Sequence, residues 1–256
     1  AVDESAITEA VTATYSYKLD LNTSYTGDDN LYVGIEAGNS STSVDFALDE
    51  SVVGDDKLNV ASMYYQFPLG NFDVAVGPKL DNDDLMPTTI SKYSDSFFFG
   101  GRVLLDTGFY SFPGVTGAGV AVSRVFDNGF NVSGSLIGTD ANSSAGLITK
   151  EGNDVKTLSV GYDTDNYGLG LVYVEMDDIC GFVAGYKTCA SLGASGVASA
   201  SSIGVGGYWT PNEGKTTLSL TINSVNASVT GLTVEDIYDS QLSVDHEMGE
   251  GVLSAS

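Results

Sequence analysis

The sequence predicts an all-β fold, an antiparallel up-and-down transmembrane β-barrel. Three observations support the prediction: long stretches of alternating apolar and polar residues, a regular succession of short and long connections, and aromatic residues at the short connections. The predicted barrel domain covers residues 11–256, after a short acidic lead at residues 1–10. The predicted strands could form one part of a larger barrel.

Composition narrows the class of protein. An apolar fraction of 42% suits a folded chain. The net charge of −24 argues against nucleic-acid binding, which needs a basic surface. No apolar run approaches the ~18 residues of a transmembrane helix, whereas transmembrane strands hide their apolar residues in alternation. With a single histidine, the chain cannot form a metal site made of several histidines.

The first predicted strand covers residues 11–25 and has the clearest alternation. Tyr17, Leu19 and Leu21 share one face, and the residues between them are polar. Strands in soluble proteins usually have ~5–6 residues, whereas a transmembrane strand needs ~9–11. The same alternation predicts nine more strands, with a weak further signal at 236–244 and an unsettled one at 97–105. They lie at residues 30–38, 58–67, 72–77, 117–125, 130–137, 155–162, 167–175, 202–209 and 216–223.

The connections between these strands alternate between short and long, five times over. Long loops are rare in compact soluble domains. Strict alternation is typical of outer-membrane barrels, which have short periplasmic turns and long extracellular loops.

Aromatic residues accompany all five short turns. They are Tyr25, Phe67, Phe72, Phe126, Phe130, Tyr162, Tyr167 and Trp209. Amphipathic rings favour the membrane–water boundary, so this pattern favours an aromatic girdle at one rim of a barrel. The alternative is that aromatic residues simply favour strand ends and cross-strand pairs.

If the apolar face meets lipid, the polar face encloses a water-filled lumen. The predicted channel-lining residues are Lys18, Asp20, Asn22, Glu36 and Asp73. A lumen of this kind passes small solutes, and acidic walls concentrate cations. We therefore expect a diffusion pore that prefers cations.

The longest connection, at about 79–116, is the candidate constriction loop. Its predicted charged residues are Lys79, Asp81, Asp83, Asp84, Lys92 and Asp95. The acidic cluster at 81–84 could bind a divalent cation such as Ca²⁺, line a constriction, or belong to a solvated loop. No other cofactor is expected.

Cys180 and Cys189 are the only cysteines. An even pair at short spacing favours a disulfide formed in an oxidising compartment, and two free thiols are the alternative. Catalysis has little support, because His246 between two acidic neighbours does not make a triad and no catalytic motif is present. The protein is therefore not expected to be an enzyme.

Five segments in colinear order carry a resemblance to a known family. They are LDLNTSYTGDDNLYVGIEAGN (19–39), YYQFPLGNFDVAVGPKLDNDDL (64–85), FDNGFNVSGSL (126–136), GYDTDNYGLGLVYV (161–174) and GYWTPNEGK (207–215). The chain resembles the major outer-membrane porins of cyanobacteria, in particular the marine picocyanobacterial branch. These porins are related to the carbohydrate-selective porin group.

The resemblance implies an outer-membrane porin, homotrimeric, that passes ions and small hydrophilic solutes, carbohydrates among them. It implies a cyanobacterial outer membrane as the location and outer-membrane lipid as a partner. The alternative is a soluble secreted β-sandwich or surface-layer module that binds glycans or calcium. The two differ in whether the apolar face meets lipid or a second sheet. A third alternative, an acidic secreted hydrolase, would require paired carboxylates in a pocket.

Overall fold

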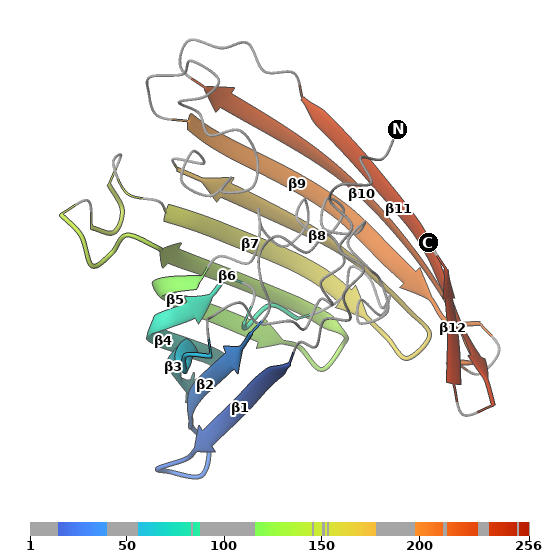
Figure 1. Cartoon of the computed structure of the whole chain (residues 1–256). Helices are drawn as coiled ribbons and strands as arrows, with labels where there is room; N and C mark the ends of the chain where they lie inside the picture. The colour runs from blue at the N-terminus through green and yellow to red at the C-terminus, as the bar shows by residue number, and fades with distance from the viewer. Residues whose placement is uncertain are drawn as a thin grey trace, which may run out of the picture.

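The computed structural model describes residues 15–39, 56–82, 84–87, 116–144, 146–149, 152, 154–177, 198–211, 214–229, 236–249 and 251–255. Twelve strands account for most of them (Figure 1). They are β1 (Ser16–Thr23), β2 (Asn30–Gly38), β3 (Asn59–Leu69), β4 (Phe72–Asp81), β5 (Thr116–Val125), β6 (Phe130–Gly138), β7 (Asp154–Asp163), β8 (Tyr167–Met176), β9 (Ala198–Trp209), β10 (Thr216–Val229), β11 (Ile237–Met248) and β12 (Gly251–Ala255). Among the described residues, no helix is long and apolar enough to cross a membrane.

The twelve strands form one sheet in which each strand pairs with the next along the chain. The pairs from β1–β2 to β11–β12 are antiparallel. The sheet is strongly curved (Figure 1). The predicted up-and-down antiparallel fold is confirmed. A second sheet packed on the first, which the sandwich alternative requires, does not occur among the described strands.

Short connections gather at one rim of the sheet and long connections at the other, because antiparallel neighbours alternate in direction. The connection from β3 to β4 consists only of Gly70 and Asn71. Gly70 has φ of 64°, in the left-handed region that glycine adopts without strain. We call the rim with the short connections the turn rim and the rim with the long connections the loop rim.

The strand register divides the side chains into two faces. The inner face contains Ala75 and Ala121, which are opposite each other on β4 and β5, and, two strands further on, Val155. The outer face contains Leu158, which alternates with the inner residues along its strand, and Leu220. Because side chains alternate with period two, the register fixes the face of every regular strand position.

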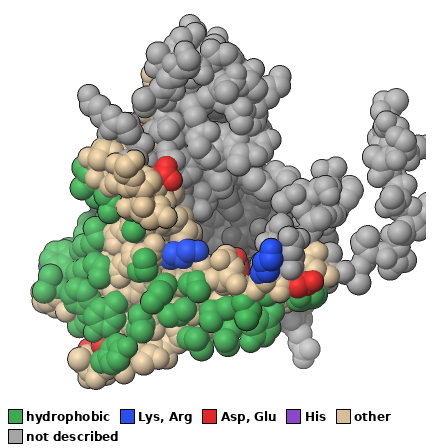
Figure 2. Space-filling model, turned by 60° about the vertical axis from the view of Figure 1, so that its left-hand side comes forward, with side chains coloured by type: hydrophobic (Ala, Val, Ile, Leu, Met, Phe, Trp, Pro, Cys, Tyr) green, Lys and Arg blue, Asp and Glu red, His purple; other side chains and the backbone are tan. Residues whose placement is uncertain are grey.

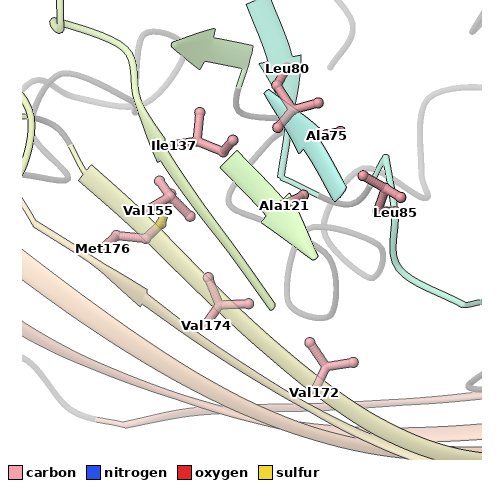
Figure 3. Close-up of a cluster of buried hydrophobic side chains, with 9 residues drawn as sticks. All are labelled: Ala75, Leu80, Leu85, Ala121, Ile137, Val155, Val172, Val174 and Met176. Atoms are coloured by element: carbon pink, nitrogen blue, oxygen red, sulfur yellow. The ribbon is translucent and has the colours of Figure 1, made fainter. Parts of the chain in front are cut away.

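A compact hydrophobic cluster lies on the inner face (Figure 3). Its members are Ala75, Leu80, Leu85, Ala121, Ile137, Val155, Val172, Val174 and Met176. They come from five strands and from the segment that follows β4. The cluster therefore fixes the start of the longest connection against the wall formed by β4 to β8.

The outer face exposes its apolar side chains. Leu169 is 56% exposed, Leu220 is 49% exposed and Leu242 is 69% exposed. In Figure 2, hydrophobic side chains gather in a broad patch on the face in view, and the visible Lys and Arg side chains lie along its border. Exposed apolar patches of this extent mark surfaces that contact a partner or a membrane.

The structure differs from the sequence prediction at several strand ends, including those of β9 and β11, and at β12. Strand β4 continues to Asp81, past an irregularity between Gly77 and Leu80 that interrupts the alternation. Strand β10 extends to Val229, past the point where its outer row changes from apolar residues to Ser224, Asn226 and Ser228. Strand β12 was not predicted, because its five residues are too few to establish a period. The signal at 97–105 lies outside the described residues.

Candidate functional site

All five predicted channel-lining residues lie on the inner face. Lys18 is opposite Glu36, and Asp20 is opposite Gly34. Asn22 is opposite Tyr32, in the same row. Asp73 is opposite Ser123, two residues along β4 from Ala75. The polar half of the alternation thus forms one continuous surface with the inner face of the remaining strands.

Most carboxylates of the regular strands lie on the inner face, whereas most basic side chains of the strands lie on the outer face. By register, carboxylates recur along the inner face, and those whose side chains the structure describes in regular strand positions are Asp20, Glu36, Asp73, Asp163, Asp245 and Glu247. Lys18 is the one basic residue among those inner positions. Arg124 and Lys156 lie in the outer rows. The inner surface is therefore strongly acidic.

Lys79 departs from its predicted place in the constriction loop. It belongs to strand β4, in register with Met63 of the outer row. Its Nζ donates a hydrogen bond to the backbone carbonyl of Val60. The sequence prediction was wrong here because the bulge around Pro78 hides the continuation of the strand.

The first part of the long connection folds onto the inner wall. Asn82 is buried, and its Nδ2 donates a hydrogen bond of 3.3 Å to Thr157 Oγ1 on β7. Its backbone carbonyl accepts a hydrogen bond of 2.6 Å from Ser135 Oγ on β6. Leu85 packs into the hydrophobic cluster. Asn82 and Leu85 therefore tie the chain after β4 to the inner face as far as β7.

Asp84 lies within this inward segment. Its Oδ2 accepts a hydrogen bond of 2.7 Å from the backbone N–H of Asp81. Although the side chain is exposed, it faces the concave side of the sheet, where the surrounding protein excludes much of the water. This desolvation, with the nearby charge of Asp81, raises the pKa of Asp84 to about 6. The carboxylate therefore changes its charge near neutral pH.

Two tyrosines, which the sequence analysis did not single out, stand beside these acidic residues on the inner face. The rings of Tyr32 and Tyr64 have centroids 5.1 Å apart at an interplanar angle of 41°. The Tyr32 hydroxyl donates a hydrogen bond of 2.6 Å to Asp20. Their signal in the sequence was an aromatic residue in an otherwise polar row, which becomes informative only once the register of β2 and β3 is known.

Aromatic side chains at the turn rim contact one another across strands. Phe130 and Tyr162 form an edge-to-face pair with centroids 4.9 Å apart, and Tyr162 lies 6.1 Å from Tyr167. Tyr167 is opposite Trp209. Such a row is the arrangement expected of an interfacial girdle. The guanidinium of Arg124, also near this rim, lies 4.3 Å from the ring centroid of Phe126.

The outer face becomes polar toward the loop rim of β7 and β8. Lys156 Nζ contacts Glu175 Oε1 at 2.9 Å and Asp177 Oδ2 at 3.2 Å. A shallow pocket of about 240 Å³ lies beside these acidic groups. Its lining residues are Tyr173, Glu175, Asp177, Ser199, Ala200, Ser201, Asn226 and Ser228. The apolar part of this wall therefore ends near Tyr173.

The strand geometry shows how His246 and its two acidic neighbours are arranged. His246 lies in the outer row and Thr216 Oγ1 is 2.9 Å from its Nδ1. Its neighbours Asp245 and Glu247 lie on the inner face, because adjacent residues of a strand point to opposite sides. The three side chains therefore do not converge.

Several predicted site residues lie outside the described residues. They are Asp83, Lys92, Asp95, Cys180 and Cys189. The disulfide and the Ca²⁺ site stay predictions. Within the described part of the chain, no three His, Cys, Asp or Glu side chains are placed to hold a metal ion.

Comparison with known proteins places the fold. No family model matches the chain, and no curated protein matches it. The chain is similar in structure to OprB of Pseudomonas putida, with a TM-score of 0.54 and 12% sequence identity, covering 91% of this chain and 64% of that one. It is also similar to the trimer form of OmpT of Vibrio cholerae, with a TM-score of 0.44, 16% identity and coverages of 93% and 77%. A porin of Rh. blastica gives a TM-score of 0.42, 11% identity and coverages of 94% and 83%.

The likeness to OprB carries the structural conclusion: the chain has the fold of an outer-membrane β-barrel of the porin type. The chain spans 64% of the length of OprB, which is less than two thirds. At 12% identity the likeness concerns the fold alone.

Proposed function

We propose that this protein is a porin of the outer membrane that allows passive diffusion of ions and small hydrophilic solutes and prefers cations. It acts as a channel and not as an enzyme. The short turns face the periplasm and the long loops face the cell exterior.

The observation that carries the proposal is the opposite chemistry of the two faces of one curved sheet. Leu169 and Leu220 stand exposed on the outer face, whereas Asp20, Glu36 and Asp73 lie on the inner face. Apolar side chains that are exposed in water are costly, and the same side chains in lipid are not. A wall of this kind is suited to separating hydrocarbon from a water-filled lumen.

The acidic inner face supports the cation preference. Fixed carboxylates raise the local concentration of cations in a narrow passage, and added salt weakens this effect. Asp84 in the inward segment and Asp20 on β1 add their charges to the same surface. Carbohydrates are candidate solutes because of the family resemblance of the sequence.

Assembly and origin follow from the same resemblance. We propose a homotrimer in a cyanobacterial outer membrane, with outer-membrane lipid against the apolar wall. Chemical cross-linking in detergent tests the assembly, since a homotrimer gives a limiting product of three chains and a monomer gives none.

Reconstitution into planar lipid bilayers tests the function. We expect discrete conductance steps in KCl and, under a KCl gradient, a reversal potential of the sign that K⁺ permeation gives. A preference for Cl⁻ would contradict the role of the acidic face and leave the pore intact. Absence of conductance from folded, inserted protein would contradict the pore itself.

A further inference from the structure

An aromatic platform flanked by carboxylates stands on the inner face of β1 to β3. Tyr32 and Tyr64 are opposite each other in the register of β2 and β3. Their ring centroids lie 5.1 Å apart. Both side chains lie on the inner face and are partly exposed.

Both rings are held in place. The Tyr32 hydroxyl is bound to Asp20 at 2.6 Å. The ring of Tyr32 lies over Gly34, where a Cβ would approach its hydroxyl to 3.2 Å and its Cε1 to 3.6 Å. Tyr64 packs against the hydrophobic cluster. A platform that is ordered before a ligand arrives loses little conformational entropy on binding.

Negative charge surrounds the platform. Asp20 touches Tyr32 directly. Asp84 lies close enough to both rings to interact with them electrostatically. Glu36 follows in the same row, opposite Lys18. Asp20 and Asp84 therefore place negative charge next to the two aromatic rings.

This combination suits a particular class of ligand. The face of an aromatic ring attracts a cation, and aromatic groups are the usual receptors for quaternary ammonium ions. A strongly hydrated inorganic cation would have to shed water to reach a ring, whereas an alkylammonium ion presents a weakly hydrated, partly apolar surface. The adjacent carboxylates neutralise its charge.

We propose that Tyr32 and Tyr64, together with the carboxylates of Asp20 and Asp84, form a binding site on the inner face for small organic cations of the quaternary ammonium type. Its place within a conduit rests on the proposed pore function. Binding itself does not, because the platform belongs to a wall that exists whether or not ions pass.

The test uses tetramethylammonium and two readouts. Binding is measured by saturation-transfer NMR on the full chain in a maltoside detergent, which carries no ammonium group. Block of the K⁺ current is measured in planar bilayers. We expect saturable binding and a concentration-dependent reduction of the current by the wild type.

Variants distinguish the contribution of the two rings to binding from that of the rest of the sheet. Tyr32→Leu and Tyr64→Leu should each weaken binding by roughly 2- to 30-fold, the range expected for loss of one cation–ring contact. Tyr32→Phe keeps the ring and should stay closer to the wild type. Tyr17→Leu removes an exposed tyrosine from the outer face of β1 and is the matched control; it should bind as the wild type does.

Two results would overturn the site. One is the absence of saturable tetramethylammonium binding to folded wild-type protein. The other is an equal effect of Tyr32→Leu and Tyr17→Leu. Binding without any ionic conductance would instead keep the site and contradict the pore, so the two proposals fail separately.

Discussion

The phenol of Tyr65 on β3 donates a hydrogen bond to the carboxylate of Asp29, which lies 36 residues earlier in the turn between β1 and β2. The other carboxylate oxygen of Asp29 accepts hydrogen bonds from Ser24 Oγ at 2.7 Å and from the backbone N–H of Thr26 at 2.7 Å. Asp29 is 7% exposed. One buried carboxylate thus fixes the first turn and ties it to the third strand.

Replacing Asp29 should therefore destabilise the folded protein. We expect Asp29→Asn to lower the temperature at which heated samples lose the migration of the folded form on gels, because an amide cannot accept all of these bonds. Asp28→Asn, one residue earlier in the same turn, is the control. An equal effect of both variants would contradict the role of Asp29.

Stability should also fall in acid through this residue. Chiefly the Tyr65 phenol, followed by the Ser24 and Thr26 donors, holds the pKa of Asp29 well below its usual range. A lowered pKa in the folded state contributes stability above the unfolded pKa of ~3.9, and the contribution is lost as pH falls below it. The wild type should lose melting temperature between pH 5 and pH 2 more steeply than Asp29→Asn, with ~3.9 as the upper edge of the change. Parallel curves would contradict this linkage.

The preference for cations should depend on pH. Desolvation by the surrounding protein raises the pKa of Asp84 to about 6, so its charge is lost as pH falls through that value. Reversal potentials under a KCl gradient should indicate weaker cation preference at pH 5 than at pH 7.5. In Asp84→Asn the change should be smaller. An identical pH dependence in both proteins would assign the effect to other carboxylates.

The raised pKa of Asp84 also affects the stability of the fold, in the direction opposite to that of the lowered pKa of Asp29. A carboxyl group whose pKa is raised in the folded state favours folding fully below the unfolded pKa, and this contribution is lost as pH rises through about 6. Asp84→Asn should therefore be at least as stable as the wild type at pH 7.5. Thermal unfolding at pH 7.5 checks this directly.

The anchor of the inward segment should contribute measurably to stability. Leu85 is 8% exposed and packs in the inner cluster, so Leu85→Ala should lower the free energy of unfolding by about 2–5 kcal/mol. Leu147→Ala is the control, because Leu147 is 40% exposed. Urea unfolding in detergent measures both. Equal losses would contradict the anchoring role of Leu85.

A charged side chain placed on the apolar outer face should destabilise the folded protein in lipid. Leu220→Arg places a guanidinium among exposed apolar neighbours and should cost about 2–4 kcal/mol if it lies near the bilayer midplane. Ser240→Arg, in the outer row nearer the loop rim, is the control and should cost less. Folding yield into lipid vesicles measures the difference. Tolerance of both substitutions would indicate that this face does not meet lipid.

The sequence predicts the strands well where one face is apolar and the other polar. Residues 16–23 and 218–223 alternate so regularly that the period alone fixes strand and face. The prediction loses accuracy where a bulge breaks the period, as at Pro78, or where the outer row changes from apolar to polar residues, as beyond Asn223.

The candidate site could be predicted only in part. The face of Asp20 follows from alternation, but the contact of Asn82 with Thr157 spans 75 residues and leaves no local pattern. The pairing of Tyr32 with Tyr64 likewise depends on the register of two strands joined by a long connection. Long-range contacts of this kind are set by tertiary structure.

The central claim is that one face of the sheet meets lipid and the other meets water, and β1 allows the most direct measurement. Single cysteines replace Leu19, Asp20, Leu21 or Asn22 in a Cys180→Ser, Cys189→Ser background, and protein in bilayers is exposed to a charged, water-soluble thiol reagent. We expect modification at 20 and 22 that changes the single-channel conductance, and protection at 19 and 21. Equal modification of all four positions, or modification only at 19 and 21, would contradict the account.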